Sequence, residues 1–204
     1  MSILRLSHVE LRTPDLELST AYYTEVIGLI ETARESDRVF FKAWDEHQHH
    51  SLVLTFAPTH GLNHLGFKVT DASDLDVYAA RLADAGVDVV RTAAGEWGPG
   101  HGESLRFGLP SGHSIELVHG MEQVGNSLPL TNPPPRPMDL VGIAPPRIDH
   151  AFLTAEDVGA TSTRKSVVAP TCWDSGSPSR SSATTGSGWR RGSRCRTRAT
   201  TSRC

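Results

Sequence analysis

Cysteine is missing from the first 159 residues of this 204-residue chain, and its three cysteines, Cys172, Cys195 and Cys204, all lie beyond that point. Their spacing does not match the paired cysteines of a zinc site, so we assign them no role. Long apolar runs are lacking too, since no segment approaches the length that spans a membrane. Residues 1–5 do not open a secretory signal, and we therefore expect a cytoplasmic protein without a membrane partner.

Acidic residues and histidine become scarce at the same point of the chain. Beyond residue 159 a single acid, Asp174, stands against eight Arg and one Lys, among ten Ser and eight Thr. Residues 1–159 hold 22 Asp and Glu against 11 Lys and Arg, and they contain all ten His. The whole-chain net charge of −3 hides this change. The two parts are therefore different kinds of sequence, and only the first has the composition of a buried core.

The first part of the chain reads as short strands and helices in alternation. Residues 4–12 alternate apolar and polar side chains, which is typical of a strand. Thr13 is the expected N-cap of a helix with Pro14 in its first turn, and this helix runs to Ile27, where Gly28 ends it. Three more strands are expected at 30–34, 39–44 and 51–56.

The same order of elements then recurs. A strand is expected at 62–69, a helix from Asp71 to Gly86, and further strands at 87–91, 104–109 and 114–119. The repeats open with LSHVEL at residue 6, LNHLGF at residue 62 and IDHAFL at residue 148, each with a histidine in third place. Such internal repetition decides the fold. We predict an α+β fold of paired β-α-β-β-β modules.

The organisation that follows has four parts. Residues 1–122 form a domain of two complete modules, and residues 123–146, which contain two runs of proline, form an extended linker. Residues 147–158 begin a third module that then breaks off. Residues 159–204 are a basic tail rich in Ser, Thr and Arg, which we expect to be disordered.

Three residues of the first two modules could hold a metal ion. His8 and His64 occupy equivalent places in the two repeats, and Glu116 lies in the last strand. Two neutral imidazoles and one carboxylate on one face of a divalent ion leave positions open for substrate and oxygen. The alternative is that each histidine only satisfies a local hydrogen bond in a half-buried strand.

The other histidines carry weaker signals. His47, His49 and His50 form a cluster in a segment that we expect to be a solvated loop. Three more are expected to be ordinary surface or turn residues: His60, His101 and His119.

The pattern of residues 5–29, 39–44, 52–54, 66–69 and 110–117 resembles the N-terminal domain of the type I extradiol ring-cleavage dioxygenases, of the catechol 2,3-dioxygenase kind. These belong to the vicinal oxygen chelate (glyoxalase-like) superfamily, and the resemblance covers residues 1 to about 158. It implies four modules in two domains, a homo-oligomer, and Fe(II) or occasionally Mn(II). It also implies cleavage of catechols beside their hydroxyls by O2, in the breakdown of aromatic compounds.

The resemblance also implies where iron binds. The family's first iron ligand matches His150, and its second histidine, its glutamate and its acid–base histidine belong to later sequence that is not recognisable here. Its N-terminal modules normally carry no iron, which favours the hydrogen-bonding interpretation of His8, His64 and Glu116. We therefore expect a truncated chain without ring-cleavage activity. The alternative is a small metal- or ligand-binding domain that uses those three residues, as two-module relatives of the superfamily do.

The genetic code suggests an origin for the tail. Read from the third base of each codon, residues 171–176 can encode Val-Leu-Gly-Phe, close to the VIGL of residues 26–29. Residues 199–204 can likewise encode a strand like the family's histidine-bearing one. We expect a base lost, or two gained, between codons 158 and 171. The alternative is a genuine basic tail that contacts nucleic-acid phosphates. Its arginines form no amphipathic stripe, so we do not expect nucleic acid as a partner.

Overall fold

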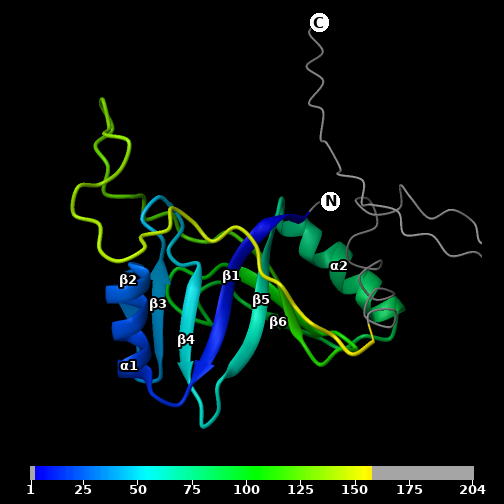
Figure 1. Cartoon of the computed structure of the whole chain (residues 1–204). Coiled ribbons are helices and arrows are strands. Elements are labelled where there is room, and N and C mark those ends of the chain that lie inside the picture. The colour runs from blue at the N-terminus through cyan, green and yellow to red at the C-terminus, as the bar shows by residue number, and fades with distance from the viewer. Residues whose placement is uncertain (1–2, 158–204) are drawn as a thin grey trace, which may run out of the picture. The chain divides into compact units, whose positions relative to one another are not determined.

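The computed structural model describes residues 3–157, and these build one eight-stranded mixed sheet (Figure 1). The strand order is β2-β3-β4-β1-β5-β8-β7-β6. The strands are β1 (Ile3–Thr13), β2 (Ile30–Arg34), β3 (Arg38–Lys42), β4 (Leu52–Phe56), β5 (Gly61–Val69), β6 (Val89–Thr92), β7 (Glu103–Gly108) and β8 (Ser114–His119). The helices are α1 (Leu16–Ala21), the π-helical turn η1 (Tyr22–Ile27) that continues it, and α2 (Ala72–Asp84).

Two β-α-β-β-β modules share this sheet, and their first strands meet at its centre. β1 pairs antiparallel with β5, and each also pairs in parallel with the last strand of its own module, β4 and β8 respectively. Because the two modules repeat the same order, residues at equivalent places of β1 and β5 come close together. The predicted α+β fold of paired modules is confirmed.

Local sequence sets the helix ends, with one difference from the prediction. Asp15, and not Thr13, is the N-cap of α1, since its carboxylate accepts the Leu18 N–H at 2.9 Å. The Thr13 hydroxyl instead accepts the Asp15 N–H at 3.2 Å, which ends β1 in a turn. At the other end of the helical segment, Gly28 has φ of +81°, a conformation that favours glycine and stops the helix as expected.

The second helix begins where the sequence predicts. Asp71 and Asp74 form a capping box at the N-terminus of α2, in which each side chain accepts the other's backbone N–H. Leu75, Tyr78 and Leu82 then point from one side of this helix into the core.

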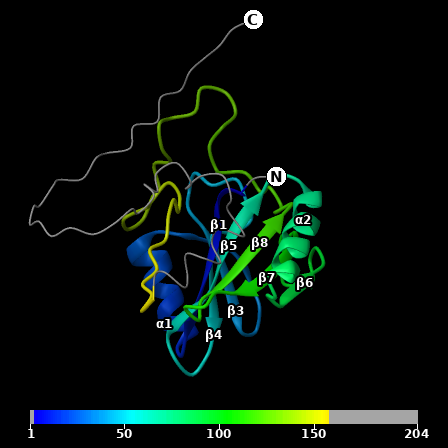
Figure 2. The ribbon, with the colours of Figure 1, turned by 90° about the vertical axis from the view of Figure 1, so that its right-hand side faces the viewer.

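The two helices lie at the two ends of the sheet (Figure 2). Val9 of β1 packs against the core clusters of both, so the two helices cover the same face. Apolar side chains alternate toward that face, such as Leu65 of β5 and Leu117 of β8. The residues next to them along each strand therefore point to the opposite face of the sheet. On β1 the alternation is reset by a register shift between Leu6 and His8, so that Leu6 and Val9 both pack in the core. His8 consequently lies on the opposite face.

The chain after β8 runs back along the first module. The described residues 120–157 form no helix or strand there. The N–H groups of Ile143 and Ala144 donate to the carbonyls of Val26 and Ile27 at 3.0 and 2.8 Å, which ties this segment to the end of η1. The linker and third-module boundaries at 123–146 and 147–158 stay predictions. The tail at 159–204 and the proposed change of frame lie outside the described residues. Among the described residues, no helix is long and apolar enough to cross a membrane.

Candidate metal centre

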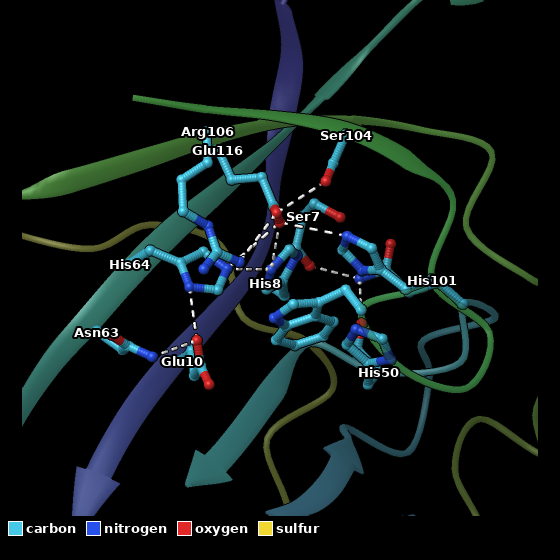
Figure 3. A network of polar contacts seen from close by, with 12 residues as sticks. Ser7, His8, Glu10, His50, Asn63, His64, His101, Ser104, Arg106 and Glu116 are labelled. Carbon is cyan, nitrogen blue, oxygen red and sulfur yellow. Dashed lines mark hydrogen bonds and ion pairs between the residues drawn. The ribbon is translucent and has the colours of Figure 1, made fainter. Parts of the chain in front are cut away.

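His8, His64 and Glu116 converge in space (Figure 3), and the strand alternation puts them on the face of the sheet opposite the helices. They come from the three adjacent strands β1, β5 and β8, and each is fully buried at 0% exposure. The two Nε2 atoms of His8 and His64 are 2.8 Å apart. They lie 3.1 and 3.3 Å, respectively, from Oε2 of Glu116. The structure thus brings together the three residues that the sequence singled out.

Strand register explains why these side chains meet. Gly66 is paired with His8 on one side and with Glu116 on the other, so the two functional residues face each other across a position without a side chain. A Cβ at Gly66 would lie 2.1 Å from Cε1 of His8 and 2.7 Å from its Nε2. Glycine at this position therefore makes room for the His8 ring.

Outer residues hold two of the three candidate ligands in place. Nδ1 of His64 contacts Oε2 of Glu10 at 2.6 Å, and that oxygen also accepts a hydrogen bond from the Asn63 amide at 2.7 Å. A carboxylate on the far nitrogen of a histidine is the usual way in which metal-binding imidazoles are oriented. Glu10 thus leaves Nε2 of His64 free to face the other two residues.

Hydrogen bonds to one carboxylate oxygen, Oε1, hold the Glu116 side chain in place. Oε1 accepts hydrogen bonds from the Ser104 hydroxyl at 2.9 Å and from the Arg106 guanidinium at 3.1 Å. Its second oxygen, Oε2, is buried and has no hydrogen-bond partner of standard geometry among the described residues. Oε2 therefore faces the histidines, and the donors Ser104 and Arg106 do not bond to it.

The charges of the group follow from burial and from these contacts. Burial favours the neutral acid of Glu116, but its contacts with His101, His64 and His8 outweigh burial and hold its pKa below the usual range. Burial lowers the pKa of His8 to about 4, so its imidazole is neutral at neutral pH. Burial also lowers the pKa of His64, but Glu10 and Glu116 outweigh it and raise this pKa overall.

Three further histidines correct the sequence-based expectations. His49, His50 and His101 are buried at 7%, 0% and 3% exposure. A solvated loop was predicted for the first two, and an ordinary surface or turn position for the third. His47 and His60 are exposed as expected. The prediction failed because loop residues carry no periodicity that reports burial. The glycine-rich run around His101 was the sequence feature that could have indicated close packing. In the structure a Cβ at Gly100 would lie 2.4 Å from the His49 ring.

His101 and Trp97 complete the surroundings of the centre. Nε2 of His101 lies 3.3 Å from Oε2 of Glu116, so three histidines approach the same carboxylate oxygen. The Trp97 ring packs against His101, His8 and His64 with centroid separations of 4.5, 5.6 and 5.6 Å. Since the indole is only partly exposed, it separates the histidines from solvent.

His150 lies apart from this cluster. Its side chain is 87% exposed, and its Nδ1 lies 3.8 Å from the carboxylate of the neighbouring Asp149. The role of His150 as the family's first iron ligand stays a prediction.

Comparisons with known proteins identify what the chain is similar to. The model of the "Catechol 2,3-dioxygenase-like N-terminal domain" matches residues 62–121. Metapyrocatechase of Pseudomonas sp. strain CF600 is 38% identical over 161 residues, which cover 78% of this chain and 52% of that protein. A manganese-dependent 2,3-dihydroxybiphenyl 1,2-dioxygenase of Geobacillus genomosp. 3 is 34% identical over 152 residues, covering 72% and 47%.

A solved structure agrees with these relatives. The 2,3-dioxygenase LapB of Pseudomonas sp. KL28 superposes with a TM-score of 0.75 at 37% identity, over 82% of this chain and 58% of that one. The chain spans about half the length of the curated relatives that it matches.

Proposed function

Since the chain belongs to the catechol 2,3-dioxygenase-like family of extradiol dioxygenases, we propose that it binds a divalent metal ion, Fe(II) or Mn(II), at His8, His64 and Glu116. One observation supports this most directly: three candidate donor atoms lie 2.8, 3.1 and 3.3 Å apart on one buried face. Three ligands that each lie about 2.1 Å from one ion, at right angles to each other, are roughly 3 Å apart.

The donor set fits such an ion chemically. Two imidazoles with one carboxylate are the ligands of non-haem iron sites that keep other positions open. The unsatisfied Oε2 of Glu116 and the oriented Nε2 of His64 are what a metal site requires before the ion binds. Because Glu10 and Glu116 raise the pKa of His64, a metal ion at its Nε2 competes with a proton, and binding weakens as the pH falls.

The chain's own residues then have distinct roles. Glu10 orients His64, while Ser104 and Arg106 fix the Glu116 carboxylate. Trp97 excludes water, which strengthens electrostatic interactions inside the centre. A bound Fe(II) would supply coordination positions for a catechol-type ligand and for O2.

We propose that full-length members of the family cleave the ring of a catechol-type substrate with O2. We propose that this chain by itself does not catalyse that reaction. The candidate ligands are fully buried, so a catechol does not reach the ion without movement of the loop that carries Trp97. His150 alone does not hold iron against water. The homo-oligomer and the cytoplasmic location also stay proposals.

Metal titration tests the binding proposal. Purified chain is titrated with Mn(II), and free Mn(II) is measured by electron paramagnetic resonance for the parent, His64→Ala and the exposed control His60→Ala. We expect tight binding in the parent and in His60→Ala, and a loss of at least about tenfold in His64→Ala because a ligand is removed. Equal affinity in all three proteins would refute the proposed centre.

An activity assay tests the proposal that this chain by itself does not cleave catechol. The Fe(II)-loaded chain is incubated with catechol and O2, and the absorbance of the yellow ring-cleavage product is followed. We expect no product. Robust product formation by the purified chain would show that the buried centre opens to substrate, and its loss in His64→Ala would place the reaction there.

A further inference from the structure

Five buried ring nitrogens in and beside the proposed centre have no hydrogen bond of standard geometry among the described residues, and two of them, Nδ1 of His64 and Nε2 of His101, lie against the carboxylates of Glu10 and Glu116. The other three have no such carboxylate contact. They are Nδ1 of His8, Nε2 of His50 and Nδ1 of His101. All three side chains are almost completely shielded from solvent. A buried imidazole nitrogen without a partner is unfavourable, because it has lost its contacts with water and gained none. Three such atoms in neighbouring side chains therefore call for a common ligand.

The rings are spaced as ligands of one ion would be. Their centroids are separated by 5.5 Å for His8 and His50, 5.3 Å for His8 and His101, and 5.7 Å for His50 and His101. Three imidazoles whose nitrogens bind one ion at about 2.0–2.1 Å have centroids roughly 5 to 5.6 Å apart. One ring nitrogen of each of the three residues also lies within 4.8 Å of the others.

We propose that His8, His50 and His101 form a second metal position beside the first, with His8 shared between the two. Nε2 of His8 lies against Glu116 and His64 (Figure 3), so the second position would use the other nitrogen of this ring, Nδ1, which has no hydrogen-bond partner among the described residues. When both nitrogens bind metal, the His8 ring carries no proton, and its former proton passes to solvent. The inference rests on the proposed function only through His8.

The chemistry of the donors indicates which ions the second position takes. Three imidazoles without a carboxylate suit Zn²⁺, Cu²⁺ or Co²⁺ better than they suit Mn²⁺, which prefers oxygen ligands. The first position, with its carboxylate, suits Fe²⁺ and Mn²⁺. The two positions therefore differ in preference, although they share one residue.

Trp97 and Phe40 close this second position. The Trp97 ring lies 5.8 Å from the His50 ring, and the ring of Phe40, from β3, lies 5.2 Å from it. The aromatic walls leave the three nitrogens without contact to bulk water. A trapped water molecule is the competing occupant of the site.

Metal stoichiometry distinguishes these occupants. The purified chain is loaded with Co²⁺, desalted and analysed by mass spectrometry for metal per chain, together with His50→Ala, His64→Ala and the exposed control His60→Ala. We expect two ions in the parent and in His60→Ala, and one ion in either other variant. The double variant His50→Ala with His64→Ala should hold none.

Other outcomes overturn one proposal or both. One ion in the parent, kept in His50→Ala and lost in His64→Ala, would mean that water fills the second position, leaving the proposed function intact. One ion lost in His50→Ala and kept in His64→Ala would support the second position and refute the first. No ion in the parent would refute both. His101→Ala is an independent second variant, and circular dichroism of each metal-free variant verifies that it folds.

Discussion

Replacing Gly66 by alanine adds only one methyl group, but we expect it to abolish metal binding at the centre. The added Cβ would lie 2.1 Å from Cε1 of His8 and 2.4 Å from its Nδ1. Carbon atoms in contact lie about 3.5–4.0 Å apart, so the His8 ring must move by roughly 1.5 Å. Metal-ligand distances tolerate deviations of only about 0.2 Å. His8 is fully buried, so a shift of its ring must also displace the side chains packed around it.

The expected loss of affinity is large. Removing an outer residue of a metal site weakens binding by roughly 10–100-fold, and displacing a ligand itself should exceed about 100-fold. Overpacking should also lower the free energy of unfolding of the metal-free chain by about 1–3 kcal/mol. The first quantity is measured by competition with a fluorescent chelator, and the second by urea denaturation.

Gly108→Ala is the matched control. No heavy atom lies within 4 Å of a Cβ at Gly108, and its backbone does not adopt the left-handed conformation. This variant should bind metal like the parent. If Gly66→Ala folds and binds metal within about threefold of Gly108→Ala, the convergence of His8 on the centre is wrong.

Three further predictions concern single residues. Glu10→Ala should weaken metal binding by roughly 10–100-fold, because His64 loses the carboxylate that orients it; unchanged binding by calorimetric titration would contradict this role. Gly28→Ala should lower the free energy of unfolding by at least about 1–2 kcal/mol, since its φ is +81° and its new Cβ would lie 1.9 Å from the Val141 carbonyl oxygen; a neutral result in urea denaturation would refute that packing. Asp71→Ala should lower the same free energy by about 1 kcal/mol through loss of the capping box, and an unaltered thermal midpoint would count against it.

The parts of the fold that were predictable from sequence are those set by local periodicity and repetition. The family resemblance is confirmed by the relatives, and the repeated opening motif placed His8 and His64 at equivalent positions of β1 and β5. Alternation along β8 turned Glu116 away from the core, toward the same face. The convergence itself required the pairing of β5 with β8, which no local pattern states.

The errors have physical reasons of their own. Thr13 and Asp15 both have side chains that can cap a helix, and only the path of the backbone after β1 decides between them. His50 and His101 lie in loops whose direction is fixed by long-range contacts, such as the packing of Trp97 across the sheet. The half of the centre built on strands was therefore accessible from sequence, and the half built on loops was not.

The most direct test of the account is a crystal structure of the chain grown with Mn²⁺, with anomalous diffraction data collected to locate the ion. We predict an anomalous peak bonded to Nε2 of His8, Nε2 of His64 and Oε2 of Glu116 on the buried face of the sheet. An ordered centre without such a peak at saturating Mn²⁺, with the three side chains bonded only to one another, would contradict the claim that these residues form a metal site.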